Sequence, residues 1–189
     1  MNGRNIVTRI RSFIFSPQQT WEEVAKEHTT NQALMFSYYL PVTFFSSLLI
    51  FTGRILNWED HSMMNGALAI IAYLLVSLLT IYLSAFILNE LLPKFGTPKK
   101  LGQSFKLVLY ASLPALIAYG ISSFHPHLGF INYLALYSIV LFWKGIKPLL
   151  SVPAEKITGF ALISMLILGA LLILLSSLIM YFIIYFSVY

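Results

Sequence analysis

The chain has 189 residues, of which 58% are hydrophobic and only 10% are charged, whereas a soluble globular domain carries about 25% charged residues. This composition excludes an ordinary soluble domain and predicts an integral membrane protein. The absence of cysteine excludes disulfides, thiolate metal sites and cysteine nucleophiles.

Residues 1–17, MNGRNIVTRIRSFIFSP, have a basic start, but their apolar part is shorter than the roughly 7–15 residues of a signal-peptide core. We therefore expect this segment to stay on the mature chain. Arg4, Arg9 and Arg11 are interleaved with isoleucine and phenylalanine. A basic amphipathic segment of this kind is typical of contact with anionic lipid headgroups.

Residues 16–28, SPQQTWEEVAKEH, predict a short helix that ends at about His28. Ser16 and Thr20 are each followed three residues later by Gln or Glu, which is the capping-box pattern of a helix start. Pro17 suits the first helical position, where its missing N–H costs nothing.

One face of this helix is apolar, with Trp21, Val24, Ala25 and His28 at helical spacing, while the other face is acidic and carries Glu27. The helix can lie on the cytoplasmic surface of the bilayer or dock on the protein. Because helices that adsorb to lipid usually have a basic polar face, we favour docking, with the basic loop at residues 99–100 as the candidate surface.

Apolar stretches long enough to cross the bilayer recur along the rest of the chain. The fourth is near the lower limit of length. The fifth is too long, so it must tilt, kink or project from the membrane. Pro41 and Pro114 lie inside the first and third, where we expect kinks that adjust packing. The expected spans are 33–53, 64–92, 104–123, 128–144 and 157–186.

The loops differ sharply in basic residues. Eleven of the 12 Lys and Arg residues fall before the first span, between the second and third, or between the fourth and fifth, and Arg54 alone falls on the other side. By the positive-inside rule, the N-terminus is cytoplasmic and the C-terminus outside. The same bias explains the net charge of +5 without a nucleic-acid partner.

The predicted fold is therefore all-α. We expect a polytopic helical bundle of five transmembrane helices in one domain, residues 32–189, preceded by a cytoplasmic basic and amphipathic segment, residues 1–31, with its short helix.

Several short motifs together resemble the Yip domain family, whose eukaryotic members were named for interaction with Ypt/Rab GTPases. The chain has P-x-x-x-W-x-x-V-x-x-E ahead of the first span, Y-x-x-x-P in the third, and a glycine at the end of the apolar fourth. The residues concerned are Pro17, Trp21, Val24, Glu27, Tyr110, Pro114 and Gly145.

This resemblance implies a five-helix membrane protein with a cytoplasmic N-terminus, which in eukaryotes is a non-enzymatic factor of early secretory and Golgi trafficking. The eukaryotic proteins carry a longer cytoplasmic N-terminal segment than the roughly thirty residues present here. The chain thus looks like the bacterial branch, so a bacterial inner membrane is expected and a Rab-binding role is not.

Polar residues within or beside the spans are the remaining site candidates. Glu90 and Lys106 lie near the cytoplasmic ends of the second and third spans and could form an ion pair, or each could snorkel to the headgroups. Asn132, Tyr133 and Tyr137 could line a polar path, or form interhelical hydrogen bonds worth about 1 kcal/mol each.

Metal and enzyme motifs are weak or absent. His125 and His127 lack a third ligand unless the outer loop with Glu59, Asp60 and His61 approaches them. The sequence has no phosphate-binding glycine loop, HExxH or G-x-S-x-G motif. We expect no metal, no cofactor and no enzymatic activity.

Two functions remain as hypotheses. The first is a non-enzymatic scaffold, assembly or membrane-organising factor that acts through the lipid bilayer, a membrane protein partner or a homo-oligomer. The second is a small transporter or channel subunit with a polar path through the third and fourth spans.

Overall fold

The computed structural model describes residues 6–57 and 63–188. Within these residues the chain is helical and has no strand. Five helical units are long and apolar enough to cross a membrane, which confirms the five expected spans. They are Asn31–Leu56, Gly66–Phe95, Leu101–Phe124, Pro126–Leu150 and Ala154–Leu178.

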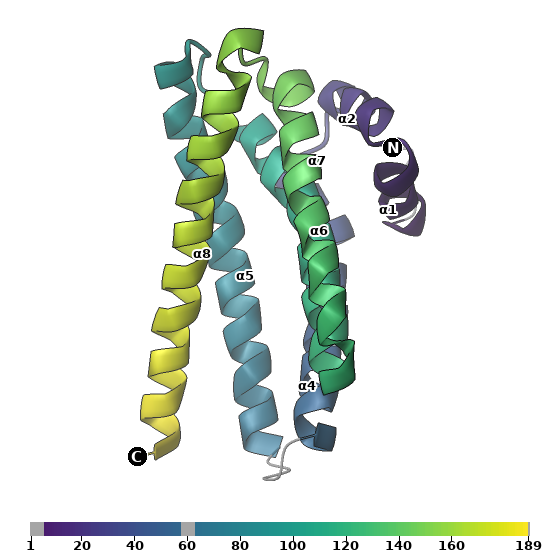
Figure 1. Ribbon diagram of the computed structural model, residues 1–189, viewed down its shortest axis with the longest axis vertical. Coiled ribbons are helices and arrows are strands. Elements are labelled where there is room, and N and C mark those ends of the chain that lie inside the picture. The colour runs from purple at the N-terminus through teal and green to yellow at the C-terminus, as the bar shows by residue number, and fades with distance from the viewer. Residues whose placement is uncertain (1–5, 58–62, 189) are drawn as a thin grey trace.

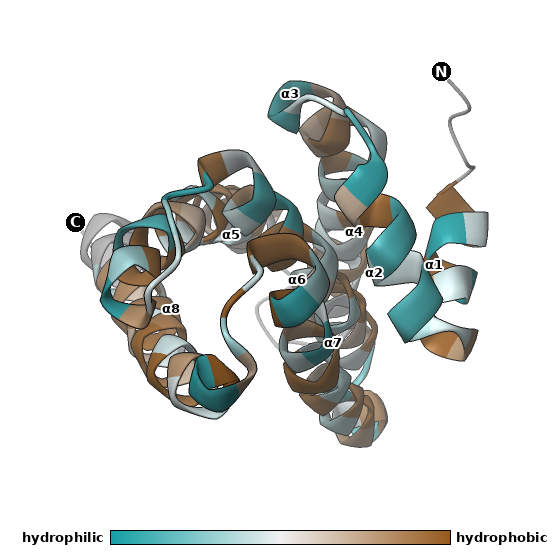
Figure 2. Cartoon of the chain, turned by 90° about the horizontal axis from the view of Figure 1, so that it is seen from above, coloured by the Kyte–Doolittle hydropathy of each residue, from teal (hydrophilic) through white to brown (hydrophobic). Residues whose placement is uncertain are grey.

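The long helices run roughly parallel to the longest axis of the molecule (Figure 1). α6 (Leu101–Phe124) lies at the centre, where it contacts α4 (Leu40–Asn57), α5 (Met63–Leu91) and α7 (Tyr137–Gly145). α8 (Ile157–Val188) packs mainly along α5 and stands apart from α4 and α6 (Figures 1 and 2).

The first span begins with α3 (Asn31–Leu34) and a π-helical turn, η1 (Met35–Tyr39), before α4. Pro41 is the second residue of α4. Proline cannot donate a hydrogen bond to the preceding turn and its ring clashes with the carbonyl four residues earlier. A widened turn directly ahead of it makes room for that ring.

Pro114 lies inside α6, whose backbone hydrogen bonds it must interrupt. The N–H of the next residue, Ala115, donates to the Ser138 hydroxyl of α7 at 3.1 Å. A neighbouring helix therefore supplies an acceptor at the interruption, as helices in membranes require.

The fourth span is longer than the expected range 128–144. It consists of a 3₁₀ helix, η3 (Pro126–Leu136), then α7, then a π-helical turn, η4 (Ile146–Leu150). A 3₁₀ helix rises by about 2.0 Å per residue, so the 11 residues of η3 cover more depth than an α-helix would. With the rise of an α-helix alone, the expected range 128–144 would only just cross the hydrocarbon layer.

The fifth span is a single helix of 32 residues, α8, drawn as one unbroken ribbon (Figure 1). At about 1.5 Å per residue it is roughly 48 Å long, well beyond the hydrocarbon thickness of about 30 Å. Its excess length must be absorbed by tilt or by projection from the membrane. The helix is preceded by η5 (Ala154–Lys156), and α5 is followed by η2 (Leu92–Phe95).

Two short helices form a hairpin ahead of the first span. α1 (Ile6–Phe15) and α2 (Pro17–Lys26) are joined at Ser16 and lie beside α6 and α7 at one end of the bundle (Figures 1 and 2). α2 ends at Lys26, short of the expected His28, and the Ser16 side chain makes no cap. The Thr20 hydroxyl instead donates to the Ser16 carbonyl at 2.8 Å.

Hydrophilic residues gather at the end of the bundle that carries this hairpin, while brown apolar residues cover the sides of the long helices (Figure 2). The start of α6 and the turn after η4 lie at the same end, tied together by Lys100, whose ammonium donates to the Leu150 carbonyl at 3.3 Å. The basic loops thus share one end, and its cytoplasmic assignment stays a prediction.

Candidate functional site at the N-terminal hairpin

An aromatic cluster fixes the hairpin to the bundle. Trp21 of α2 is fully buried, and its ring meets Phe13 of α1 edge-on at 4.8 Å between centroids. Tyr110 of α6 lies 5.0 Å from Phe13 and 6.2 Å from Trp21. Tyr38, at the start of the first span, lies 5.6 Å from Tyr110. Four segments of the chain therefore meet around these rings, which we call the aromatic cluster.

Gly145 allows α7 to approach this cluster closely. A Cβ atom there would lie 2.5 Å from Leu107 Cδ1 and 2.8 Å from the Trp21 ring. Both distances are below normal contact, so a larger residue would have to displace one of these buried side chains. The glycine at the end of the fourth span thus provides the space into which Trp21 packs.

Arg9 is buried in the hairpin, only 2% exposed. Its guanidinium donates a hydrogen bond to the Glu27 carboxylate and lies 4.0 Å from Glu23. The Tyr110 ring lies 5.9 Å from the guanidinium carbon. Burial lowers the pKa of Arg9, but the hydrogen bond to Glu27 and the surrounding charges raise it above its usual range overall, so Arg9 stays charged.

The expected lipid contact of the basic segment is therefore wrong for Arg9, because Glu27 holds this side chain inside the protein. Arg11, two residues later, is exposed and its guanidinium lies 5.8 Å over the Phe15 ring. Arg4 lies outside the described residues.

Lys106 joins α6 to the carboxyl end of α2. Its ammonium donates to the Val24 carbonyl at 3.3 Å and to the Glu27 carbonyl at 2.5 Å. The last carbonyls of a helix lack partners within that helix and carry partial negative charge, so a lysine at this position stabilises them. Sequence reasoning missed this role because the contact joins residues about eighty positions apart.

The ion pair between Glu90 and Lys106, one of the two alternatives from the sequence, is not formed in the structure. Glu90 pairs with Lys99 at 2.5 Å, because the chain reverses at Gly96, whose φ of 79° favours glycine. This short reversal returns Lys99 to the end of α5, while Lys106 faces α2.

The expected docking surface at Lys99 and Lys100 is also corrected. α2 packs on α7 and η4, and Lys100 donates to the Leu150 carbonyl and the Ser151 hydroxyl. Both lysines are thus engaged elsewhere. The buried face of α2 consists of Thr20, Trp21 and Val24.

Most of the motif positions in the sequence meet at this hairpin. Trp21, Val24 and Tyr110 are each fully buried, and Gly145 lies against Trp21. Pro17 opens α2, and Pro114 lies one turn beyond Tyr110 on α6.

A family model described as the Yip1 domain matches residues 11–187. The chain belongs to the Yip1 domain family. No curated protein and no solved structure matches it. The match spans nearly the whole chain, including most of the hairpin, and the Yip1 family is not known as enzymatic.

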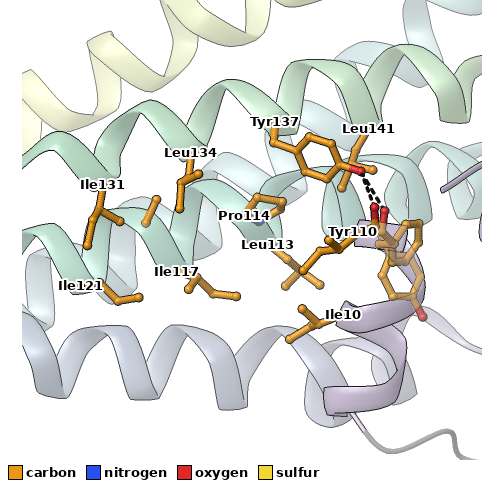
Figure 3. Close-up of a pocket in the computed structure, with 13 residues that line it drawn as sticks. Ile10, Tyr110, Leu113, Pro114, Ile117, Ile121, Ile131, Leu134, Tyr137 and Leu141 are labelled. Atoms are coloured by element: carbon orange, nitrogen blue, oxygen red, sulfur yellow. Dashed lines mark hydrogen bonds between the residues drawn. The ribbon is translucent and has the colours of Figure 1, made fainter. Parts of the chain in front are cut away.

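Next to the aromatic cluster, the Yip1 domain contains an apolar pocket of about 430 Å³, which we call the apolar pocket. Figure 3 shows α6 residues on one side, η3 and α7 residues on the other, and Ile10 of α1 at one end. Tyr137 closes the wall beside α1 by donating from its hydroxyl to the Phe13 carbonyl at 2.9 Å. The lining residues are Ile10, Phe13, Ile14, Tyr110, Leu113, Pro114, Ile117, Ala118, Ile121, Ile131, Leu134, Tyr137 and Leu141.

This pocket could not be predicted from the sequence, because most of its lining residues resemble the other apolar residues of the spans. Tyr110 and Pro114 were singled out as motif residues, and Tyr137 as part of the polar path, but none of them as part of a pocket. The Ser122 hydroxyl donates to Asn132 at 2.8 Å, and Tyr133 is 76% exposed. Of the three path residues, only Tyr137 lines the apolar pocket, and a shared path stays a prediction.

A second, polar cleft of about 480 Å³ opens beside the end of α2 and the start of α6, with Glu27, His28 and Lys106 in its wall. On the far side of the bundle, the rings of His125 and His127 stack at 5.0 Å. Among the described residues, no three potential metal ligands gather at one point. Glu59, Asp60 and His61 lie outside the described residues.

Proposed function

We propose that this multi-pass membrane protein of the Yip1 family is a non-enzymatic scaffold, assembly or membrane-organising factor of a bacterial inner membrane. The observation that carries the proposal is the hairpin, which is held on the bundle by the aromatic cluster and by Arg9, Glu27 and Lys106. A surface fixed in this way can present one constant shape to a partner at low entropic cost.

The exposed faces of the two hairpin helices differ in chemistry. On α1, Val7, Ile14 and Phe15 are 67%, 54% and 75% exposed, and Arg11 lies among them. An apolar face with a cation suits the boundary between headgroups and hydrocarbon. This helix is the candidate lipid contact.

On α2 the exposed residues are polar, and they include Gln18, Gln19, Glu22 and Lys26. A mixed, partly acidic surface at the predicted cytoplasmic end is better suited to a protein partner than to anionic lipid. The buried face of the same helix is already occupied by the bundle, so the partner would meet only this polar face.

The proposal is tested by recovering the tagged protein from its native membrane at native expression level after brief cross-linking. We expect a stoichiometric protein partner that is lost in Glu22→Lys, which reverses a charge on the exposed face of α2. Glu155→Lys is the matched control, because Glu155 is exposed but lies in η5. Recovery of the protein alone, from both the parent and the control, would contradict the α2 surface as a docking face.

The cytoplasmic position of the hairpin has its own test, since the chain contains no cysteine. Two single-cysteine variants, Gln19→Cys and His127→Cys, place an exposed thiol at opposite ends of the bundle. A membrane-impermeant thiol reagent added to intact cells should label only the second. Labelling of Gln19→Cys alone would show that the hairpin lies outside and that the predicted orientation is reversed.

A further inference from the structure

The apolar pocket lies along the spans rather than across them. On α6 its lining runs from Tyr110 to Ile121, which is about 16 Å at 1.5 Å per residue. The opposite wall, from Ile131 to Leu141, belongs to the fourth span. Figure 3 shows the two rows of side chains facing one another along this length. The pocket is therefore elongated and lies within the segment of the bundle expected in hydrocarbon.

Water is a poor occupant for such a space. A buried water needs two to four polar partners, and apolar cavities stay dry. The lining side chains are aliphatic or aromatic apart from the hydroxyls of two tyrosines, and the Tyr137 hydroxyl already donates to α1. The volume of about 430 Å³ falls in the range of roughly 300–1,000 Å³ typical of ligand sites. A hydrocarbon chain from the bilayer fits this lining and this depth.

Two cations lie on the helices that line the pocket. Arg11 lies one helical turn from Ile14, and Lys144 lies one turn from Leu141, so each shares a helix face with a lining residue. Both are exposed, and neither has an ion-pair partner within residues 6–57 and 63–188. Arg9 differs, because Glu27 neutralises it. Positive charge on the helices that form the apolar pocket would favour a ligand with a hydrocarbon chain and an anionic headgroup.

We propose that the apolar pocket holds one acyl chain of an anionic phospholipid, whose phosphate group contacts Arg11 and Lys144. This inference deepens the proposed function, on which it rests, by naming the lipid partner of the hairpin. Because α1 closes one end of the pocket, a bound chain would lie between α6 and the fourth span with its end against the hairpin. Lipid binding therefore stabilises the docked position of α1.

The test uses the full chain, purified in mild detergent and examined by native mass spectrometry with added phosphatidylglycerol or phosphatidylcholine of identical acyl chains. We expect one phosphatidylglycerol per chain and weaker binding of phosphatidylcholine. Ile117→Trp fills the pocket and should abolish that binding. Leu166→Trp is the matched control, since Leu166 is 74% exposed on α8, and it should bind lipid as the parent does.

A second pair of variants tests the headgroup contact. Arg11→Gln and Lys144→Gln should each weaken phosphatidylglycerol binding about fivefold, from roughly 1 kcal/mol for a basic residue near an anionic surface. Binding of phosphatidylcholine should not change. Should Ile117→Trp fail to fold, Leu134→Trp occupies the opposite wall, where Leu134 is 63% exposed and lines the same pocket.

Two results would overturn the inference. One is undiminished phosphatidylglycerol binding in the folded pocket-filling variants, and the other is equal binding of both lipids by the parent chain. These failures are separable from failure of the proposed function, because cross-linked recovery of a protein partner depends on the exposed face of α2. A pocket-filling variant that loses lipid but keeps the protein partner would support both proposals.

Discussion

The hairpin helix α2 and the last span α8 reverse the usual relation between apolarity and burial. α2 carries Glu22, Glu23 and Lys26, yet its Trp21 and Val24 are fully buried. α8 is the most apolar of the five spans, yet only 17% of its most apolar window is buried in the protein, compared with 50% for α6. The more polar helix is thus the more firmly integrated one.

The reason lies in the solvent. Within a bilayer, apolar side chains gain little by leaving lipid for protein, so helices associate through close packing and polar contacts. α2 has both, in the Trp21–Gly145 contact and the Lys106 cap. α8 packs closely mainly near its start, where Phe160, Ala161 and Ser164 are fully buried. The polar and small residues therefore decide where the bundle is tight.

Truncating the buried tryptophan should have the largest effect. Trp21→Ala removes the ring at the centre of the aromatic cluster and should lower the free energy of unfolding by about 3–5 kcal/mol. Unfolding by SDS in mixed micelles measures this change. Trp143→Ala is the control, because Trp143 is 39% exposed, and it should cost about 1 kcal/mol or less. Equal losses would show that the cluster is no tighter than the lipid-facing surface.

Removing one carboxylate should rank next. Glu27→Gln leaves the buried charge of Arg9 with only Glu23, at 4.0 Å, to oppose it, and should cost about 3 kcal/mol. Glu90→Gln breaks the exposed pair with Lys99 and should cost less than about 1 kcal/mol. The same unfolding assay compares them. A loss in Glu90→Gln as large as that in Glu27→Gln would contradict the electrostatic role of the hairpin.

Glycine substitution tests the close approach of α7. Gly145→Ala places a methyl group against Leu107 and Trp21 and should cost about 1–3 kcal/mol through overpacking. Gly169→Ala is the matched control on α8, where a Cβ meets nothing within 4 Å. It should be neutral or stabilising by up to about 1 kcal/mol, because alanine favours helix. If the two variants unfold alike, Gly145 is not a packing position.

The number of spans and their approximate limits could be predicted, because a hydrocarbon layer of fixed thickness demands long apolar helices. Features that do not follow a helical period could not be predicted. The fourth span was expected to lie near the lower limit of length, because no pattern in residues 126–136 predicts a 3₁₀ helix. The interruption of the α6 hydrogen bonds at Pro114 could be predicted from the sequence. The Ser138 hydroxyl of α7, which accepts a hydrogen bond from the Ala115 N–H, could not.

At the site, the motif residues of α2 were visible as the apolar face of a short helix. Their partners were not visible, because Arg9 resembles any basic residue near a membrane and Lys106 resembles a snorkelling lysine. Each role depends on a contact across the tertiary structure. The apolar pocket depends on how the helices pack. Because nearly every residue of the spans is apolar, the sequence does not show where the packing leaves a cavity.

The exposed face of α8 offers the smallest expected effect and the sharpest test of the comparison. Leu166→Ala exchanges one lipid-facing apolar residue for another and should change the free energy of unfolding by no more than about 0.5 kcal/mol. Leu88→Ala on α5 is the control, since Leu88 is fully buried and should lose about 2–5 kcal/mol. A large loss in Leu166→Ala, together with a fall in the mass of the detergent-solubilised particle, would mean that a second copy of the chain covers α8. The low burial of this span would then reflect a missing protein neighbour, and the lipid-facing interpretation would be wrong.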